Sequence, residues 1–236
     1  MGKDFETRLD ATVTATPEQV WDAIATGPGI SSWFVGRTEI DGDAVRTSFG
    51  DNWFPAGTVT THDQPHHFAY RSDTAPDGRF IAYEYLVEGR DQSATVLRTV
   101  TSGFLPGDDW AAEYEAMQYG TALFFATLVE YLTYFPGRPA TPVTAFGPRV
   151  TDWPAAWRTL TDALGLDPAP RPGDTTADGG TVYFTNPHTL GIRTADGFHR
   201  YLRGLHQGAM VASHELVTPA DADPARWTDF LTTLYA

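Results

Sequence analysis

The longest regular pattern of core-type side chains in this sequence lies between Asp109 and Phe135. These side chains recur at intervals of three or four residues: Trp110, Tyr114, Met117, Thr121, Phe124, Leu128, Leu132 and Phe135. This spacing puts them on one stripe of an α-helix. The sequence GDD at 107–109 provides a start signal and Pro136-Gly137 a stop signal. A helix of this length extends over roughly 40 Å, so its stripe needs a broad apolar surface to cover it.

The residues before this helix alternate between apolar and polar positions, a pattern typical of β-strands. Phe5 to Val13 is the first such segment, and Thr16 and Pro17 then open a helix. A second short helix is predicted for 30–34, after a break at Gly27-Pro28-Gly29. Further strands are predicted at 37–40, 44–49, 58–62, 67–72, 80–88 and 95–104. We therefore expect an α+β helix-grip arrangement, in which a curved antiparallel sheet wraps around the long helix and leaves a space between them.

The rest of the chain predicts a smaller α+β region. Residues 136–148 contain four prolines and no clear period, so a proline-rich linker is predicted over 137–150. Beyond it the pattern predicts a helix at 153–164, strands at 181–185, 189–194, 198–205 and 209–217, and a helix at 221–235. The predicted division is a first domain over 1–136, the linker, and a C-terminal region over 151–236. That region is either a degenerate second copy of the first domain or an appendage that covers one edge of the first sheet.

Charge and composition exclude several classes of function. The 236 residues include 16 basic and 30 acidic side chains, a formal charge of −14, which disfavours binding to nucleic acid or to an anionic membrane. There is no cysteine, so disulfides, thiolate chemistry and zinc–thiolate sites are excluded. Neither an apolar signal segment nor a run of about 18 apolar residues is found. These observations predict a cytoplasmic protein.

Two groups of motifs carry a resemblance to a known superfamily. The stretch TPEQVWDAI at 16–24, followed by Trp33-Phe34, resembles the opening of the SRPBCC superfamily of START, polyketide-cyclase and Bet-v-like helix-grip proteins. The stretches TVLR at 95–98 and TSGF at 101–104, followed by Asp109-Trp110 and a long helix, are similar to its heat-shock-protein-90 ATPase activator homologue branch. The resemblance covers about residues 5 to 135. It implies a deep apolar cavity between sheet and helix; members bind lipids, hormones or polyketides, and some are cyclases or hydrolases.

The candidate ligand-binding residues are those expected to line this cavity. They are Trp33, Phe34, Tyr83, Tyr85, Arg98, Met117, Thr121, Phe124 and Phe125. The alternative is that these aromatic side chains simply fill a core; the tyrosines favour a cavity slightly, because a buried hydroxyl needs a hydrogen-bond partner. Arg98 faces the cavity if Val96 and Val100 point inward, where it could anchor a carboxylate or enolate. With the opposite parity it is a surface residue.

No catalytic residue, cofactor or metal site is predicted. The histidines near 62–67 surround a turn, and those at 188, 199, 206 and 214 fall on separate strands, which is not the convergence that a metal needs. Nucleophile-elbow, P-loop and dinucleotide motifs are missing from the sequence. Three functions stay open: a carrier or sensor of a small apolar molecule, a cyclase- or hydrolase-type enzyme using the same cavity, and a protein-interaction or co-chaperone-like module. We prefer the first, and leave open a protein partner or a homodimer.

Overall fold

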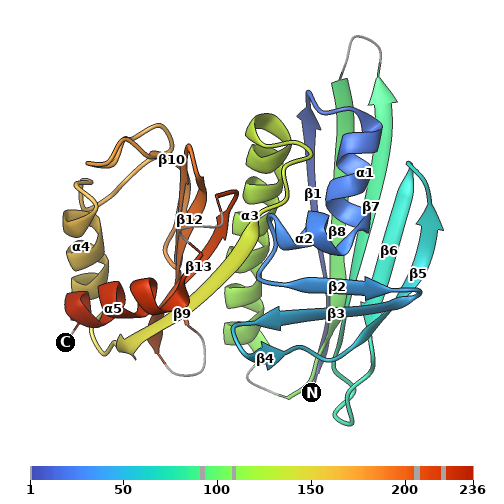
Figure 1. Cartoon of the computed structure of the whole chain (residues 1–236). Helices are drawn as coiled ribbons and strands as arrows, with labels where there is room; N and C mark the ends of the chain where they lie inside the picture. Colours follow the sequence, from blue (N-terminus) through green and yellow to red (C-terminus); the bar gives the residue numbers. More distant parts are fainter. Residues whose placement is uncertain (1, 91–93, 108–109, 205–207, 219–221, 236) are drawn as a thin grey trace. The chain divides into compact units, whose positions relative to one another are not determined.

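The computed structural model describes residues 2–90, 94–107, 110–204, 208–218 and 222–235. The chain forms two compact units, an N-terminal unit over 1–139 and a C-terminal unit over 140–236 (Figure 1). Each unit is an antiparallel sheet with helices, so the predicted α+β fold class is confirmed. Among the described residues, no helix has the length and apolar character needed to cross a membrane.

The N-terminal unit contains a sheet of eight strands in its described part, in the order β1-β8-β7-β6-β5-β3-β2, with β4 paired to β3. The strands are β1 (Lys3–Val13), β2 (Thr38–Asp41), β3 (Ala44–Phe49), β4 (Asn52–Trp53), β5 (Gly57–Asp63), β6 (His67–Ser72), β7 (Phe80–Arg90) and β8 (Ala94–Leu105). The helices are α1 (Pro17–Ala25), α2 (Gly27–Ser31) and α3 (Trp110–Tyr134). All three helices lie on one side of the sheet (Figure 1), which leaves the other side uncovered within this unit.

The first helix begins where the sequence predicts. The Thr16 backbone N–H donates to Gln19 Oε1 at 2.9 Å, and the Gln19 backbone N–H donates to Thr16 Oγ1 at 3.3 Å. This reciprocal capping box satisfies two backbone donors at the helix start.

The predicted break at 27–29 is wrong, because α2 begins there rather than at Ile30. Thr26 Oγ1 accepts a hydrogen bond from the Gly29 backbone N–H at 3.0 Å and so caps this helix. Pro28 fits the first turn, where its missing N–H costs nothing. The proline and glycines that suggested an interruption are therefore compatible with a helix start.

The long helix α3 confirms the predicted helix over 109–135 to within one residue at each end. Its predicted start signal at residues 108–109 lies outside the described residues. After its end, Gly137 has a φ of 74°, a left-handed conformation that glycine adopts without strain. The stop signal is thus confirmed.

The C-terminal unit contains a five-stranded antiparallel sheet in its described part, in the order β10-β11-β12-β13-β9. Its strands are β9 (Thr141–Arg149), β10 (Thr181–Asn186), β11 (Thr189–Thr194), β12 (Gly197–Arg203) and β13 (Ala209–Leu216). Its helices are α4 (Trp153–Ala163) and α5 (Pro224–Tyr235).

The predicted linker over 137–150 is wrong, because most of it forms β9. This strand lies at the edge of its sheet, where prolines such as Pro142 and Pro148 are tolerated since one side of the strand needs no ladder hydrogen bonds. Val143 and Ala145 alternate inward and are both only 2% exposed. The strand belongs to the C-terminal unit, so the predicted region over 151–236 was too short.

The two units share one connectivity. In each, the first strand pairs with the last strand of the same sheet: β1 with β8, and β9 with β13. Between them the chain forms helix and then a run of antiparallel strands, and each unit ends in a helix. A shortened second copy would have this connectivity; a common origin of the two units stays a prediction.

Candidate ligand-binding site

Strand register brings three tyrosines onto one face of the N-terminal sheet. Tyr83 on β7 lies opposite Tyr70 on β6 and Thr101 on β8, and Tyr85 lies opposite Thr99. The Tyr70 and Tyr83 rings are stacked, with centroids 5.0 Å apart. Because side chains alternate along a strand, all of these residues point to the side that carries the helices.

The segment after α2 places two aromatic rings over these tyrosines. The Trp33 indole N–H donates to the Ala23 carbonyl at 2.9 Å, and its ring meets Tyr85 edge-on at 6.2 Å. Phe34 meets Tyr83 at 5.5 Å and Phe124 of α3 at 5.1 Å, both edge-on. Phe34 therefore bridges the sheet and the long helix. The structure brings together Trp33, Phe34, Tyr83, Tyr85 and Phe124, as the sequence predicts.

The tyrosine hydroxyls of this face stay neutral. Burial raises the pKa of Tyr83 to about 12, and burial together with neighbouring tyrosines raises the pKa of Tyr70 and of Tyr85. Tyr70 and Tyr85 are closed off from solvent, but the Tyr83 side chain is only half-buried. Of these three tyrosines, Tyr83 is the one that keeps accessible surface.

The remaining candidates on α3 are less well defined by contacts. Met117, Thr121 and Phe125 are all half-buried positions of the helix. Phe124 and Phe125 are consecutive, so they point about 100° apart around the helix axis. A role of Met117, Thr121 and Phe125 in binding stays a prediction.

The assignment of Arg98 to the cavity is wrong. Its neighbours Leu97, Thr99 and Thr101 face the helices and are buried, so Arg98 points to the opposite face of β8. Its side chain is 45% exposed, and it lies 3.9 Å from Glu88 across the strand pair. The alternative parity considered for this strand is the observed one, consistent with the high cost of burying an unpaired guanidinium.

Sequence reasoning missed two features of this face. Tyr70 was not among the candidates, although its alternation with Phe68 in a predicted strand would have placed it inward. Phe5 of β1 and Tyr114 of α3 also meet, with centroids 5.7 Å apart. The second contact depends on how α3 packs on β1, which the sequence pattern does not state.

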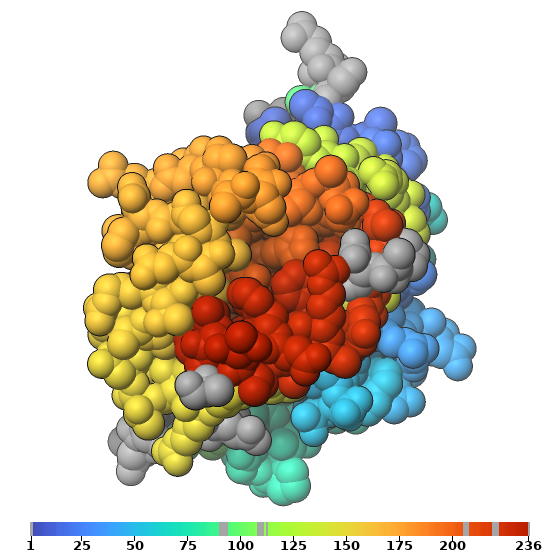
Figure 2. Space-filling view, turned by 60° about the vertical axis from the view of Figure 1, so that its left-hand side comes forward, coloured from blue at the N-terminus to red at the C-terminus, as the bar shows by residue number. Residues whose placement is uncertain are grey.

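A cleft in the C-terminal unit was also not predicted. It has a volume of about 650 Å³ and lies among α4, residues 176–180, β11, β12 and α5. Figure 2 looks onto this side of the unit, with α5 in red and the segment after α4 in orange. His199 and Trp227 are among its walls.

Comparisons with known proteins give similarities of structure. Neither a family model nor a curated protein sequence matches the chain. The protein MLL2253 from Mesorhizobium loti has 19% identity and a TM-score of 0.45, over 54% of this chain and 96% of that chain. The Aha1 dimer from Colwellia psychrerythraea has 18% identity and a TM-score of 0.44, over 56% and 99%. DynU16, a protein in the dynemicin biosynthetic locus, has 18% identity and a TM-score of 0.44, over 89% and 86%. Similarities at this level assign neither a family nor a function.

Proposed function

We propose that the N-terminal unit binds a small, largely apolar molecule between its sheet and α3, as a carrier or sensor of that molecule. The observation that carries the proposal is the environment of Tyr83. Its pKa is raised to about 12 by burial, yet its side chain keeps accessible surface beside Phe34 and Phe124. Phe124 is half-buried as well, whereas Trp33 and Phe34 are only 3% and 8% exposed, so the accessible surface of this face lies at Tyr83 and Phe124.

The side chains of this face define the chemistry of the ligand. Phe124 and Tyr83 keep accessible aromatic surface, and the buried Phe34 packs against both, which favours an apolar body. The neutral hydroxyl of Tyr83 can donate a hydrogen bond to an acceptor atom. Since Arg98 points away, it offers no charge for a carboxylate. The ligand that fits best is therefore a neutral molecule with few acceptors.

The position of Arg98 also bears on the choice between ligand binding and catalysis. The enzyme alternative expects either an inward Arg98, which could polarise a carbonyl or hold an enolate, or a tyrosine–carboxylate pair beside the cavity. With Arg98 on the outer face, the first of these is ruled out. Ligand binding without chemistry is accordingly the function that these residues favour.

Native mass spectrometry of the chain purified from its own host tests the proposal. We expect a fraction of the protein to carry the added mass of a small molecule. Thr121→Trp, which fills the space beside Phe124, should remove this mass. Thr133→Trp, the same change at an exposed position of the same helix, should keep it.

A protein free of added mass, together with no thermal shift across a panel of lipids and polyketides, would contradict ligand binding. Retention of the added mass in Thr121→Trp would contradict the location between the sheet and α3.

A further inference from the structure

The packing of α3 differs between its two halves. In the described part of this helix, every buried position lies at Leu123 or later, and the earlier positions are half-buried or exposed. The predicted stripe follows the same division, with half-buried members first and buried members at the end. The half-buried members are Tyr114, Met117, Thr121 and Phe124, and the buried ones are Leu128, Leu132 and Phe135. The first half of α3, residues 110–122, is therefore the less tightly packed half.

The inner face of β7 shows the same gradient. Ile81 and Tyr83 are half-buried, whereas Tyr85, further along the strand, is only 3% exposed. Ile81 pairs with Gly103 of β8, and Gly103 pairs with Phe5 of β1, so the accessible end of this face is the end at which β1 and β7 begin. The first turns of α3 lie at this end of the sheet, near the N-terminus (Figure 1).

Side-chain contacts tie the first turns of α3 to this end of the sheet. The Arg79 guanidinium, next to the start of β7, forms an ion pair with Glu113 of α3. The Phe5 ring on β1 lies 5.7 Å from the Tyr114 ring, centroid to centroid. The side chains of the ion pair are 38% and 29% exposed, so water and salt reach them and weaken their attraction. The ion pair is therefore a contact that a change in ionic strength can loosen.

The turn before β7 holds Arg79 in place. The Arg79 backbone N–H donates to Asp77 Oδ1 at 3.1 Å, and Arg79 Nε lies 3.7 Å from Asp77 Oδ2. The Ala75 backbone N–H donates to the Arg79 carbonyl at 2.9 Å. Because these hydrogen bonds fix the turn, the side of the ion pair that moves is the helix.

A glycine separates the two halves of α3. Gly120 lies in the interior of the helix, where glycine is less favourable than alanine. An added Cβ there would lie 3.6 Å from Phe124 Cε2, an ordinary van der Waals distance, so packing does not require a glycine. Its effect is to weaken the helix between the loosely packed half and the buried half.

We propose that the first half of α3 is a gate over the site between the sheet and this helix, held closed by the Arg79–Glu113 ion pair. When the pair separates, the helix bends near Gly120 and an apolar molecule enters beside Tyr83 and Phe124. Higher ionic strength favours the open state because it screens the pair. The admission of a ligand rests on the proposed function, whereas the motion of the helix does not.

Hydrogen exchange of the full chain, read on peptides from 111–122 and 123–134, tests the motion. Arg79→Gln removes the ion pair and leaves Glu113 at the helix start, so exchange in 111–122 should become about two- to fivefold faster. Exchange in 123–134 should not change. Gly120→Ala should slow exchange in 111–122 about fivefold, because alanine favours the helix.

Further variants separate the ion pair from the helix dipole. If the two side chains act as a pair, the double variant Arg79→Gln, Glu113→Gln should exchange at the rate of Glu113→Gln alone. Glu115→Gln removes a carboxylate from an exposed position near the same end of α3 and should change exchange in 111–122 by less than about twofold. Salt should speed exchange of 111–122 in the unaltered chain and have no such effect in Arg79→Gln.

Stopped-flow fluorescence with prodan, a neutral naphthalene ketone, tests whether this motion admits a ligand. Loss of the ion pair lowers the same barrier for entry and for exit. Arg79→Gln should therefore raise the association and dissociation rate constants by the same factor, about two- to fivefold, and leave Kd unchanged.

The gate is contradicted by equal exchange of 111–122 in Arg79→Gln and the unaltered chain, by an equal effect of salt on the two proteins, or by equal rates of prodan binding. Gly120→Ala and the salt series keep the test decisive should Arg79→Gln not fold. The expected exchange without any binding of prodan would support the motion of α3 and count against the proposed function.

Discussion

The two units share a connectivity but differ in how the last helix meets the sheet. In the N-terminal unit, Phe124 of α3 and Tyr83 of β7 stay half-buried on the inner side, and three tyrosine hydroxyls face inward. In the C-terminal unit, Leu231 of α5 is fully buried in a closed apolar core. That core also contains Leu160, Val182, Leu190, Ile192, Met210, Ala212 and Leu216.

The difference follows from the lengths of the elements and the size of the sheet. Helix α3 has 25 residues and extends over about 38 Å, whereas α5 has 12 and extends over about 18 Å. The short helix α5 buries its stripe on a five-stranded sheet through Trp227 and Leu231, and the cleft lies to one side, near the end of α4. Connectivity therefore does not decide whether a space is enclosed. Element lengths and side-chain volumes decide it.

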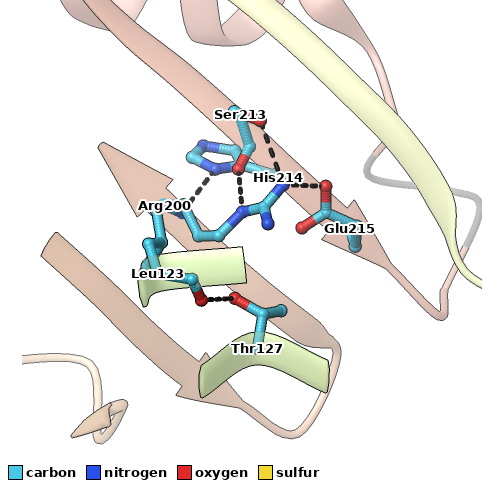
Figure 3. A network of polar contacts seen from close by, with 6 residues as sticks. All are labelled: Leu123, Thr127, Arg200, Ser213, His214 and Glu215. Carbon is cyan, nitrogen blue, oxygen red and sulfur yellow. Dashed lines mark hydrogen bonds and ion pairs between the residues drawn. The ribbon is translucent and has the colours of Figure 1, made fainter. Parts of the chain in front are cut away.

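The largest loss of stability is expected when the buried ion pair of the C-terminal unit is broken, compared with an exposed pair in the N-terminal unit. Arg200 and Glu215 on β12 and β13 are in contact and fully buried, and Arg200 also donates to the Ser213 carbonyl at 2.9 Å (Figure 3). Glu215→Ala leaves the guanidinium without its carboxylate, and we expect a loss of roughly 3–5 kcal/mol in the free energy of unfolding of the C-terminal unit. Hydrogen exchange of β12 and β13 peptides in urea measures it.

The matched control is the exposed pair of the N-terminal unit. Arg98 and Glu88 are 3.9 Å apart and 45% and 58% exposed, so Glu88→Ala should cost less than about 1 kcal/mol. Comparable losses in the two variants would contradict the contrast between buried and exposed pairs.

Leu231→Ala and Phe124→Ala compare the stability cost of truncating a fully buried side chain in the C-terminal unit with that of truncating a half-buried one in the N-terminal unit. Leu231 has no exposed surface, so its truncation should cost roughly 2–5 kcal/mol. Phe124 is half-buried, so its truncation should cost less than the roughly 3–5 kcal/mol typical of a buried phenylalanine. Hydrogen exchange of α5 and of α3 peptides reports the two values separately. A greater loss in Phe124→Ala than in Leu231→Ala would show that the N-terminal unit is filled.

The same contrast explains what the sequence could and could not predict. The span of α3 was predictable because an apolar period of three to four over 25 residues favours a helix. The stripe was predicted less well, because Leu123, Thr127 and Tyr131 lie outside it and are buried. The strand β9 was not, because Pro142 and Pro148 are turn signals everywhere except at a sheet edge, and edge position is a property of the whole sheet.

The candidate site was predictable in part for a related reason. Trp33, Phe34, Tyr83, Tyr85 and Phe124 lie in segments with clear periods, and the structure brings them together. Arg98 required knowledge of which strand face is inward, since Val96 and Leu97 are both apolar and both buried. The C-terminal cleft depends on a loop, on Gly180 and on the approach of α5, none of which has a periodic signal.

Acid should destabilise the C-terminal unit through His214. Burial, and then the nearby His199, Arg200 and Arg226, lower the pKa of His214 well below 6.5. Below pH 6.5 the unfolded chain binds a proton that the folded unit does not, so the contribution of His214 to stability falls as the pH falls, by up to about 1.4 kcal/mol per pH unit. Above pH 6.5 this group adds no pH dependence. Burial raises the pKa of Glu215 to about 8, so this carboxyl acts in the opposite direction over the same pH range, and the effect of His214 is read from the comparison with its variant.

The measurement is the free energy of unfolding of the C-terminal unit between pH 8 and pH 5, in the unaltered chain and in His214→Gln. The glutamine can accept the hydrogen bond that the Arg200 backbone N–H donates to His214 Nδ1 at 3.0 Å, but it cannot titrate, so the slope below pH 6.5 should decrease by up to about 1.4 kcal/mol per pH unit. Parallel curves for the two proteins would show that His214 is protonated equally in the folded and unfolded chain.

The smallest loss of stability is expected at the first helix of each unit, because the two units cap this helix differently. Thr16 caps α1 in a reciprocal box with Gln19, whereas Asp152 caps α4 through one hydrogen bond, from the Ala155 N–H at 3.0 Å. Thr16→Ala and Asp152→Ala should each cost about 1 kcal/mol. Only the aspartate carries a charge at the positive end of the helix dipole, so salt should reduce the effect of Asp152→Ala and leave that of Thr16→Ala unchanged. Hydrogen exchange of α1 and α4 peptides at low and at high salt tests this, and equal salt dependence would mean that both caps act through hydrogen bonding alone.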